Sequence, residues 1–121
     1  MKKNILVVDD EADVRISIKN IFEHEGHGVY TSENGMKCIE ILEKGFCGIL
    51  LIDLMMPQMD GWATIKEIVK RGLDRNVDII VITAVGTKRH NKMIGLQPYI
   101  HDYIAKPFDI QELLKNIKKL N

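Results

Sequence analysis

The stretch Ile5-Leu6-Val7-Val8-Asp9-Asp10-Glu11 joins a short aliphatic run to three acidic residues. An aliphatic run rich in β-branched residues is typical of a strand that is buried on both faces of a sheet. Similar runs follow along the chain, at residues 29–31, 49–52, 79–82 and, with a weaker pattern, 103–105. The sequence therefore predicts five buried strands, the first of which leads directly into acidic residues.

Segments with helical periodicity separate these runs. In the last segment, apolar residues recur at spacings of three and four, which predicts a helix with one buried face: Ile110, Leu113, Leu114 and Ile117. Glycines stand where the first three helices should end, at residues 26, 45 and 72, and Asp109 stands where the last should begin. Strict alternation of strands and helices predicts an α/β fold with a parallel sheet and helices on both faces.

The composition of the chain limits the classes of protein to which it can belong. A chain of 121 residues with 45% hydrophobic content suits a single domain spanning residues 1–121. Lysine plus arginine and aspartate plus glutamate both number 17, so net charge draws the protein neither to nucleic acid nor to a membrane surface. The chain has no signal peptide and no run of about 20 apolar residues, which predicts a cytoplasmic protein. Cys38 and Cys47 lie in apolar sequence and are expected to be buried free thiols.

Polar residues follow four of the five expected strands, and they are the Asp9-Asp10-Glu11 run, Asp53, Thr83 and Lys106. The carboxyl ends of parallel strands meet at one edge of the sheet, which is where open α/β sheets bind ligands. Each residue alone has an ordinary structural explanation, such as capping a helix. Their convergence on one edge predicts a functional site.

Three carboxylates brought together repel one another unless they are protonated or bridged by a cation. Mg²⁺ binds few carboxylate or carbonyl oxygens in proteins and completes its shell with waters and phosphate oxygens. Asp53 then remains available as a nucleophile toward a phosphoryl group, because Mg²⁺ and Lys106 supply the positive charge that such a transfer needs.

At these residues the sequence resembles the receiver domains of two-component signalling. The resemblance extends over the whole chain, from the opening stretch through Asp53-Leu54-Met55-Met56-Pro57-Gln58-Met59-Asp60-Gly61 to Lys106-Pro107-Phe108. It implies a flavodoxin-like (βα)5 fold, a doubly wound five-stranded parallel sheet in the order 2-1-3-4-5, with a cis Lys106–Pro107 bond. It also implies a signalling protein that takes a phosphoryl group from a histidine kinase or phosphotransfer protein, rather than a turnover enzyme.

The resemblance also assigns roles to site residues. Asp53 would be the phosphoacceptor, and Asp10, Asp53 and the carbonyl of Met55 would bind Mg²⁺ directly, with Asp9 acting through water. Thr83 would bind a phosphoryl oxygen, and Lys106 would pair with the phosphate.

The signal would pass to an output partner through Tyr103, the switching aromatic residue. The surface that changes would comprise the helix expected between residues 87 and 96, the fifth strand and the last helix. Gly95 and Pro98 interrupt that helix, so we expect it to be short or irregular. Asn116 replaces an arginine that some family members use in dimers, which favours a monomer or a weak phosphorylation-dependent dimer. No direct nucleic-acid or membrane partner is expected, and the output partner is left open.

Three other classes of protein are alternatives to this interpretation. A phosphohydrolase with an aspartyl nucleophile needs a second acid two residues later, where this chain has Met55. A flavin binder needs a glycine-, serine- or threonine-rich loop after the first strand, where Asp9 and Asp10 would repel phosphate. A pseudo-receiver that accepts no phosphoryl group stays open, and labelling with acetyl phosphate and Mg²⁺ would distinguish it. If the chain is a receiver, apolar Met55 and Val85 predict a long-lived aspartyl phosphate, because neither can orient the attacking water.

Overall fold

The computed structural model describes residues 2–83, 95–106 and 108–120. Its strands are β1 (Asn4–Val8), β2 (Gly28–Ser32), β3 (Gly48–Asp53), β4 (Val77–Thr83) and β5 (Ile100–Ala105). Its α-helices are α1 (Ala12–His24), α2 (Gly35–Glu43), α3 (Gly61–Lys70) and α4 (Ile110–Lys118), and short 3₁₀ turns span Leu73–Asn76 and Gln97–Tyr99. The helix expected between residues 87 and 96 falls mainly on residues 84–94, which lie outside the described part, as does Pro107 with the predicted cis bond.

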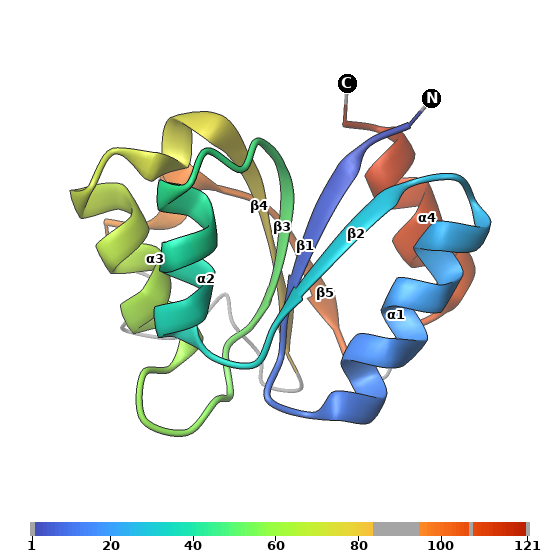
Figure 1. The fold of residues 1–121 in the computed structure, drawn as a ribbon, viewed down its shortest axis with the longest axis horizontal. Coiled ribbons are helices and arrows are strands. Elements are labelled where there is room, and N and C mark those ends of the chain that lie inside the picture. Colours follow the sequence, from blue (N-terminus) through green and yellow to red (C-terminus); the bar gives the residue numbers. More distant parts are fainter. Residues whose placement is uncertain (1, 84–94, 107, 121) are drawn as a thin grey trace.

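The strands form one five-stranded sheet in the order β2-β1-β3-β4-β5, and every neighbouring pair is parallel. This confirms the predicted fold. Figure 1 shows the sheet between two layers of helices, with α2 and α3 on one face and α1 and α4 on the other. The aliphatic runs are therefore covered on both faces, which is why their sequence shows no polar alternation.

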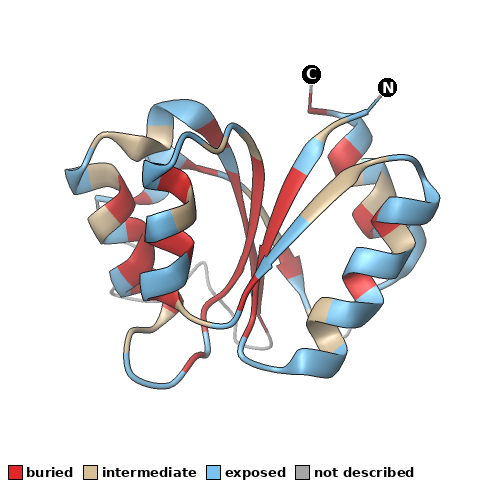
Figure 2. Ribbon diagram, viewed as in Figure 1, coloured by how far each residue is buried: buried red, intermediate tan, exposed pale blue. Residues whose placement is uncertain are grey.

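Alternate residues of each central strand enter two separate cores. Leu6 and Val8 pack on the face covered by α2 and α3, together with Ile65 of α3. Ile5 and Val7 pack on the face covered by α1 and α4. Figure 2 shows buried residues concentrated in the strands and on the sides of the helices that face the sheet. The helical stripes read from the sequence are thus the faces that cover the sheet.

Helix boundaries follow the predicted signals. The first three helices end two residues before a glycine with positive φ, at Gly26, Gly45 and Gly72. Helix α4 begins after Asp109, whose side chain accepts a hydrogen bond of 3.0 Å from the backbone N–H of Gln111. Among the described residues, none of the helices has the length and apolar character needed to cross a membrane.

The fifth strand begins three residues earlier than predicted, at Ile100. Ile79 pairs with Ile100, but the next residue, Ile80, pairs with Asp102, so His101 is an extra residue in the ladder. This irregularity explains the missed boundary, because an inserted polar residue breaks the sequence period that reveals a strand.

The prediction for the two cysteines was right for one and wrong for the other. Cys38 is buried, and burial raises the pKa of its thiol to about 12. Cys47 is exposed, because it lies in the turn between α2 and β3 before the buried part of the strand begins. Both are free thiols, as predicted.

Candidate functional site

The carboxyl edge of the sheet brings three carboxylates together. Asp9 follows β1 and Asp53 ends β3, and these neighbouring strands are in register, with Val8 beside Ile52. One oxygen each of Asp9, Asp10 and Asp53 lies within 4.8 Å of the others. Asp9 and Asp53 are only 3% and 4% exposed, whereas Asp10 is exposed to solvent. The structure thus gathers all three acids that the sequence singled out.

Lys106 lies between two of these acids. Its Nζ donates hydrogen bonds to Oδ2 of Asp9 at 3.0 Å and to Oδ2 of Asp53 at 3.1 Å. Its backbone N–H donates to the carbonyl of Thr83 at 2.9 Å, which ties the residue to the end of β4. Thr83 is 2% exposed and lies at the same edge of the sheet. Four strands therefore contribute to one site, with the ammonium at its centre.

Backbone N–H groups fix the second oxygen of both buried carboxylates. The N–H of Met55 donates to Oδ1 of Asp53 at 3.0 Å, and the N–H of Glu11 donates to Oδ1 of Asp9 at 2.9 Å. Such bonds two residues along the chain are the usual way in which aspartate orders its own loop. A carboxylate oxygen can accept more than one bond, so these oxygens can still bind a cation or approach a phosphorus atom.

The site carries more negative charge than its lysine balances. Burial raises the pKa of Asp53, hydrogen bonds from Met55 and Lys106 lower it, the charge of Asp9 raises it, and the net result is a raised pKa. Burial lowers the pKa of Lys106, but the hydrogen bonds and charges of Asp9 and Asp53 outweigh it, and the net result is again a raised pKa. Both residues therefore hold a proton more readily than usual, Asp53 mainly because it is buried and Lys106 because two carboxylates accept its hydrogen bonds.

Met55 and Tyr103 are the remaining predicted site residues that the structure describes. The Met55 side chain is 62% exposed, while its backbone contacts Asp53. Tyr103 is half-buried and packs against the core under α2 and α3. Burial raises the pKa of Tyr103, and its buried hydroxyl has no hydrogen-bond partner among the described residues. Val85, the other residue named for a long-lived phosphate, lies outside the described part.

Two residues that support the site were missed by sequence reasoning. Arg15 of α1 donates a hydrogen bond of 2.6 Å from Nη1 to the backbone carbonyl of Asp9. Gly61 begins α3 so close to the end of β3 that a Cβ there would lie 2.5 Å from the carbonyl oxygen of Asp53 and 2.6 Å from Cα of Leu54. Neither contact has a local sequence signal, because each joins residues from different elements.

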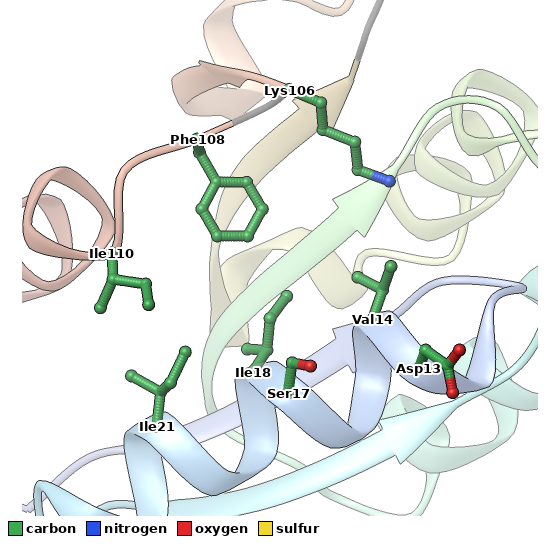
Figure 3. A pocket seen from close by; sticks show the side chains of 8 residues that line it. All are labelled: Asp13, Val14, Ser17, Ile18, Ile21, Lys106, Phe108 and Ile110. Atoms are coloured by element: carbon green, nitrogen blue, oxygen red, sulfur yellow. The ribbon is translucent and has the colours of Figure 1, made fainter.

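A groove of about 540 Å³ runs from the site along α1. Figure 3 shows Phe108 and Ile110 facing Ile18 and Ile21 across it, with the ammonium of Lys106 near one end. The remaining lining residues come from α1, and they are Asp13, Val14 and Ser17. The groove therefore offers an apolar surface that leads to the charged edge of the sheet.

Buried acids at adjacent strand ends, a shared lysine and a buried threonine are the chemistry of a phosphoacceptor site. The sequence model of the response regulator receiver domain matches residues 5–118, and the chain belongs to this family. It is the receiver domain of a response regulator in two-component signalling, and the pocket formed by Asp9, Asp10 and Asp53 fits a phosphoacceptor site.

Relatives agree with this assignment over nearly the whole chain. Sporulation initiation phosphotransferase F of Bacillus subtilis (strain 168) is 32% identical over 122 residues, which cover 98% of this chain and 94% of that protein. A CheY-like receiver domain protein from Methanospirillum hungatei JF-1 has a crystal structure with a TM-score of 0.89 at 42% identity, covering 96% of this chain and 91% of that one. Response regulator TrrA from Thermotoga maritima, crystallised in complex with Mg(2+)-BeF, has a TM-score of 0.83 at 32% identity, covering 98% and 99%.

Proposed function

We propose that Asp53 accepts a phosphoryl group from the phosphohistidine of a histidine kinase or phosphotransfer protein. The observation that supports this most directly is the carboxylate of Asp53. It is 4% exposed, one oxygen accepts from the Met55 N–H, and the other accepts from Lys106 at 3.1 Å. A carboxylate oriented in this way presents an oxygen to an incoming phosphorus atom beside a positive charge.

In the proposed step, an oxygen of Asp53 forms a bond to phosphorus as the bond between phosphorus and the histidine nitrogen breaks. The leaving imidazole keeps the electron pair, so charge shifts onto the phosphoryl oxygens and the donor ring. Lys106 remains beside Asp53 and stabilises that charge. Thr83, buried at the end of β4, would bind one phosphoryl oxygen after transfer.

The acidic cluster fits a divalent cation, since one oxygen from each of its three carboxylates lies within 4.8 Å of the others and Lys106 is the ammonium that pairs with two of them. We propose that Asp10, Asp53 and the carbonyl of Met55 bind Mg²⁺ directly and that Asp9 acts through water. When bound, Mg²⁺ would neutralise charge on the transferred phosphoryl oxygens. The Mg(2+)-BeF complex of TrrA supports this choice of metal.

Phosphorylation would then change the surface that an output partner contacts. Thr83 and Tyr103 lie near the ends of the paired strands β4 and β5, so movement of one toward the phosphoryl group changes the space open to the other. Amide exchange with and without beryllofluoride should differ at Tyr103 and in residues 85–89. An unchanged pattern would contradict the switch but not the phosphoacceptor.

Acetyl phosphate with Mg²⁺ tests the phosphoacceptor directly. The wild-type chain should gain one phosphoryl group, about 80 Da, and Asp53→Asn should gain none. Asp78→Asn is the matched control, because Asp78 is an exposed residue near the opposite end of β4 and should leave labelling unchanged. Labelling of Asp53→Asn at the wild-type rate would overturn the assignment, and an unlabelled wild type would favour the pseudo-receiver.

A further inference from the structure

The contact between Arg15 and Asp9 has no part in the proposed phosphoryl transfer. Arg15 lies near the start of α1, and its side chain extends back past the helix N-terminus to donate a hydrogen bond of 2.6 Å to the carbonyl of Asp9. That carbonyl belongs to the peptide unit that joins Asp9 to Asp10. The direction of the carbonyl therefore sets where the chain, and with it Asp10, turns after β1.

Asp9 is fixed at every one of its polar groups. Its N–H donates to the carbonyl of Ser32 at 3.2 Å, its two carboxylate oxygens accept from Glu11 and Lys106, and its carbonyl accepts from Arg15. Of these four contacts, the one from Arg15 acts on the peptide that leads to Asp10. Its removal would leave the carboxylate of Asp9 bound and would free that peptide.

Asp10 itself has little else to fix it. It is exposed, it lies between the end of β1 and the start of α1, and the N-cap residue Glu11 makes no side-chain capping bond. No hydrogen bond to the Asp10 carboxylate is present among the described residues. Yet an oxygen of this carboxylate lies within 4.8 Å of oxygens from Asp9 and Asp53.

We propose that Arg15 is a positioning residue for the cation site. Its guanidinium fixes the peptide between Asp9 and Asp10, so that the exposed Asp10 carboxylate stays beside the two buried acids before any cation binds. This inference rests on the proposed cation site and assigns Arg15 no contact with the cation. Residues that orient metal ligands from outside the coordination sphere commonly change metal affinity by about 10–100-fold when they are replaced.

Charge alone predicts that Arg15 has the opposite effect on Mg²⁺ binding. A guanidinium near three carboxylates repels a divalent cation, so removing it should tighten Mg²⁺ binding if Coulomb interactions decide. If positioning decides, removing it should weaken binding. Arg15→Lys separates the two further, because lysine keeps the charge but lacks the planar fork of donors.

The test is calorimetric titration of the full chain with Mg²⁺. We expect Arg15→Ala to bind about tenfold more weakly than wild type, with Arg15→Lys in between. Arg71→Ala is the matched control, because Arg71 pairs with Glu43 and Glu67 near the C-terminal ends of α2 and α3, and it should bind as wild type does.

A second readout does not depend on the metal. Without Mg²⁺, the backbone amide NMR resonance of Asp10 should shift or broaden in Arg15→Ala relative to wild type, because its peptide is no longer held, while the amide resonances of the core strands stay the same. Equal or tighter Mg²⁺ binding by Arg15→Ala would overturn the positioning role. Absence of Mg²⁺ binding by the wild type would instead overturn the cation site, and this inference with it.

Discussion

The two faces of the sheet are covered by equal numbers of described helices but packed differently. On the face of α2 and α3, helices approach so closely that a Cβ at Gly35 would lie 2.1 Å from the hydroxyl oxygen of Thr64. On the other face, α1 and the segment that leads into α4 leave a groove of about 540 Å³. The packed face fixes the loop that follows Asp53, whereas the open face leaves an apolar path to Lys106. The face of α2 and α3 thus holds the site rigid, and the face of α1 and α4 gives access to it.

Of the variants that test this difference between the two faces, Gly61→Ala should have the largest effect. The new methyl group would meet backbone atoms of Asp53 and Leu54, which cannot rotate away, so we expect a loss of about 2–3 kcal/mol in the free energy of unfolding. Displacement of the Asp53 peptide should also slow labelling by acetyl phosphate. Urea unfolding and mass spectrometry measure the two effects.

Gly26→Ala is the control for this variant. Gly26 has a φ of 91° but nothing within 4 Å of a Cβ, so the substitution adds backbone strain alone, about 1 kcal/mol, far from the site. Labelling should be unchanged. If both alanine variants label as the wild type does, the packed face does not control the position of Asp53.

Sequence reasoning identified the central strands, the helix ends and the charged edge because each has a local signal. An aliphatic run predicts a buried strand, and a glycine after a helix predicts a left-handed turn. A polar residue after an aliphatic run marks the carboxyl end of a parallel strand, where ligands bind. From these signals, Asp9, Asp53 and Lys106 could be placed together. The contacts of Arg15 and Gly61 could not, because each depends on how a helix lies against a strand end.

The errors have the same cause. Cys47 is flanked by apolar residues in the sequence, but exposure is decided by the turn between α2 and β3, which no periodic pattern encodes. The start of β5 was missed because His101 interrupts the strand, and the pairing with β4 continues across the interruption. Pairing between strands is a tertiary property that overrides local pattern.

Ile110→Gln should produce the next largest effect, on the open face. Ile110 is 45% exposed and lines the groove beside Lys106, so a protein that delivers a phosphoryl group over this surface would lose an apolar contact. We expect transfer from a phosphohistidine protein to fall about tenfold, equivalent to about 1.4 kcal/mol. Labelling by acetyl phosphate, which needs no docking, should stay the same.

Met36→Gln is the matched change on the packed side, since Met36 is 61% exposed on α2 and lies outside the groove. It should leave both reactions unchanged. Equal loss of transfer in the two variants would show that the groove does not contact the phosphohistidine protein.

Asp53→Asn should stabilise the fold, and its effect should be smaller than those of Gly61→Ala and Ile110→Gln. Because the folded-state pKa of Asp53 is raised above its ordinary value of 3.8, the favourable contribution of this group is complete below that value and is lost as pH rises through the folded pKa. At pH 7 the neutral amide avoids the cost of the buried charge, and we expect a gain in unfolding free energy. Thermal unfolding at pH 7 and at pH 3 should show the gain at the higher pH alone, and a gain of equal size at both would contradict the electrostatic explanation.

Gln58→Asn should give the smallest effect. Gln58, in the loop between β3 and α3, has a φ of 64°, a conformation that asparagine adopts more readily than glutamine. We expect a gain of about 0.5 kcal/mol in unfolding free energy. Gln111→Asn, in the first turn of α4, is the control and should give no gain. Equal gains in both would rule out strain at Gln58 as the cause.

The extra residue in β5 can be lost without disturbing the site. Ile100 and Tyr103 both pack under α2 and α3 although they are three residues apart, because His101 absorbs one position, and Ile104 then packs under α1 and α4. Deleting His101 would leave a regular ladder, because Ile100 and Tyr103 would then be two residues apart and would keep their shared face. Deleting both His101 and Asp102 would instead place Tyr103 directly after Ile100, which would turn Tyr103 toward α1 and carry Lys106 away from Asp53. This part of the chain should therefore tolerate the loss of one residue and not the loss of two.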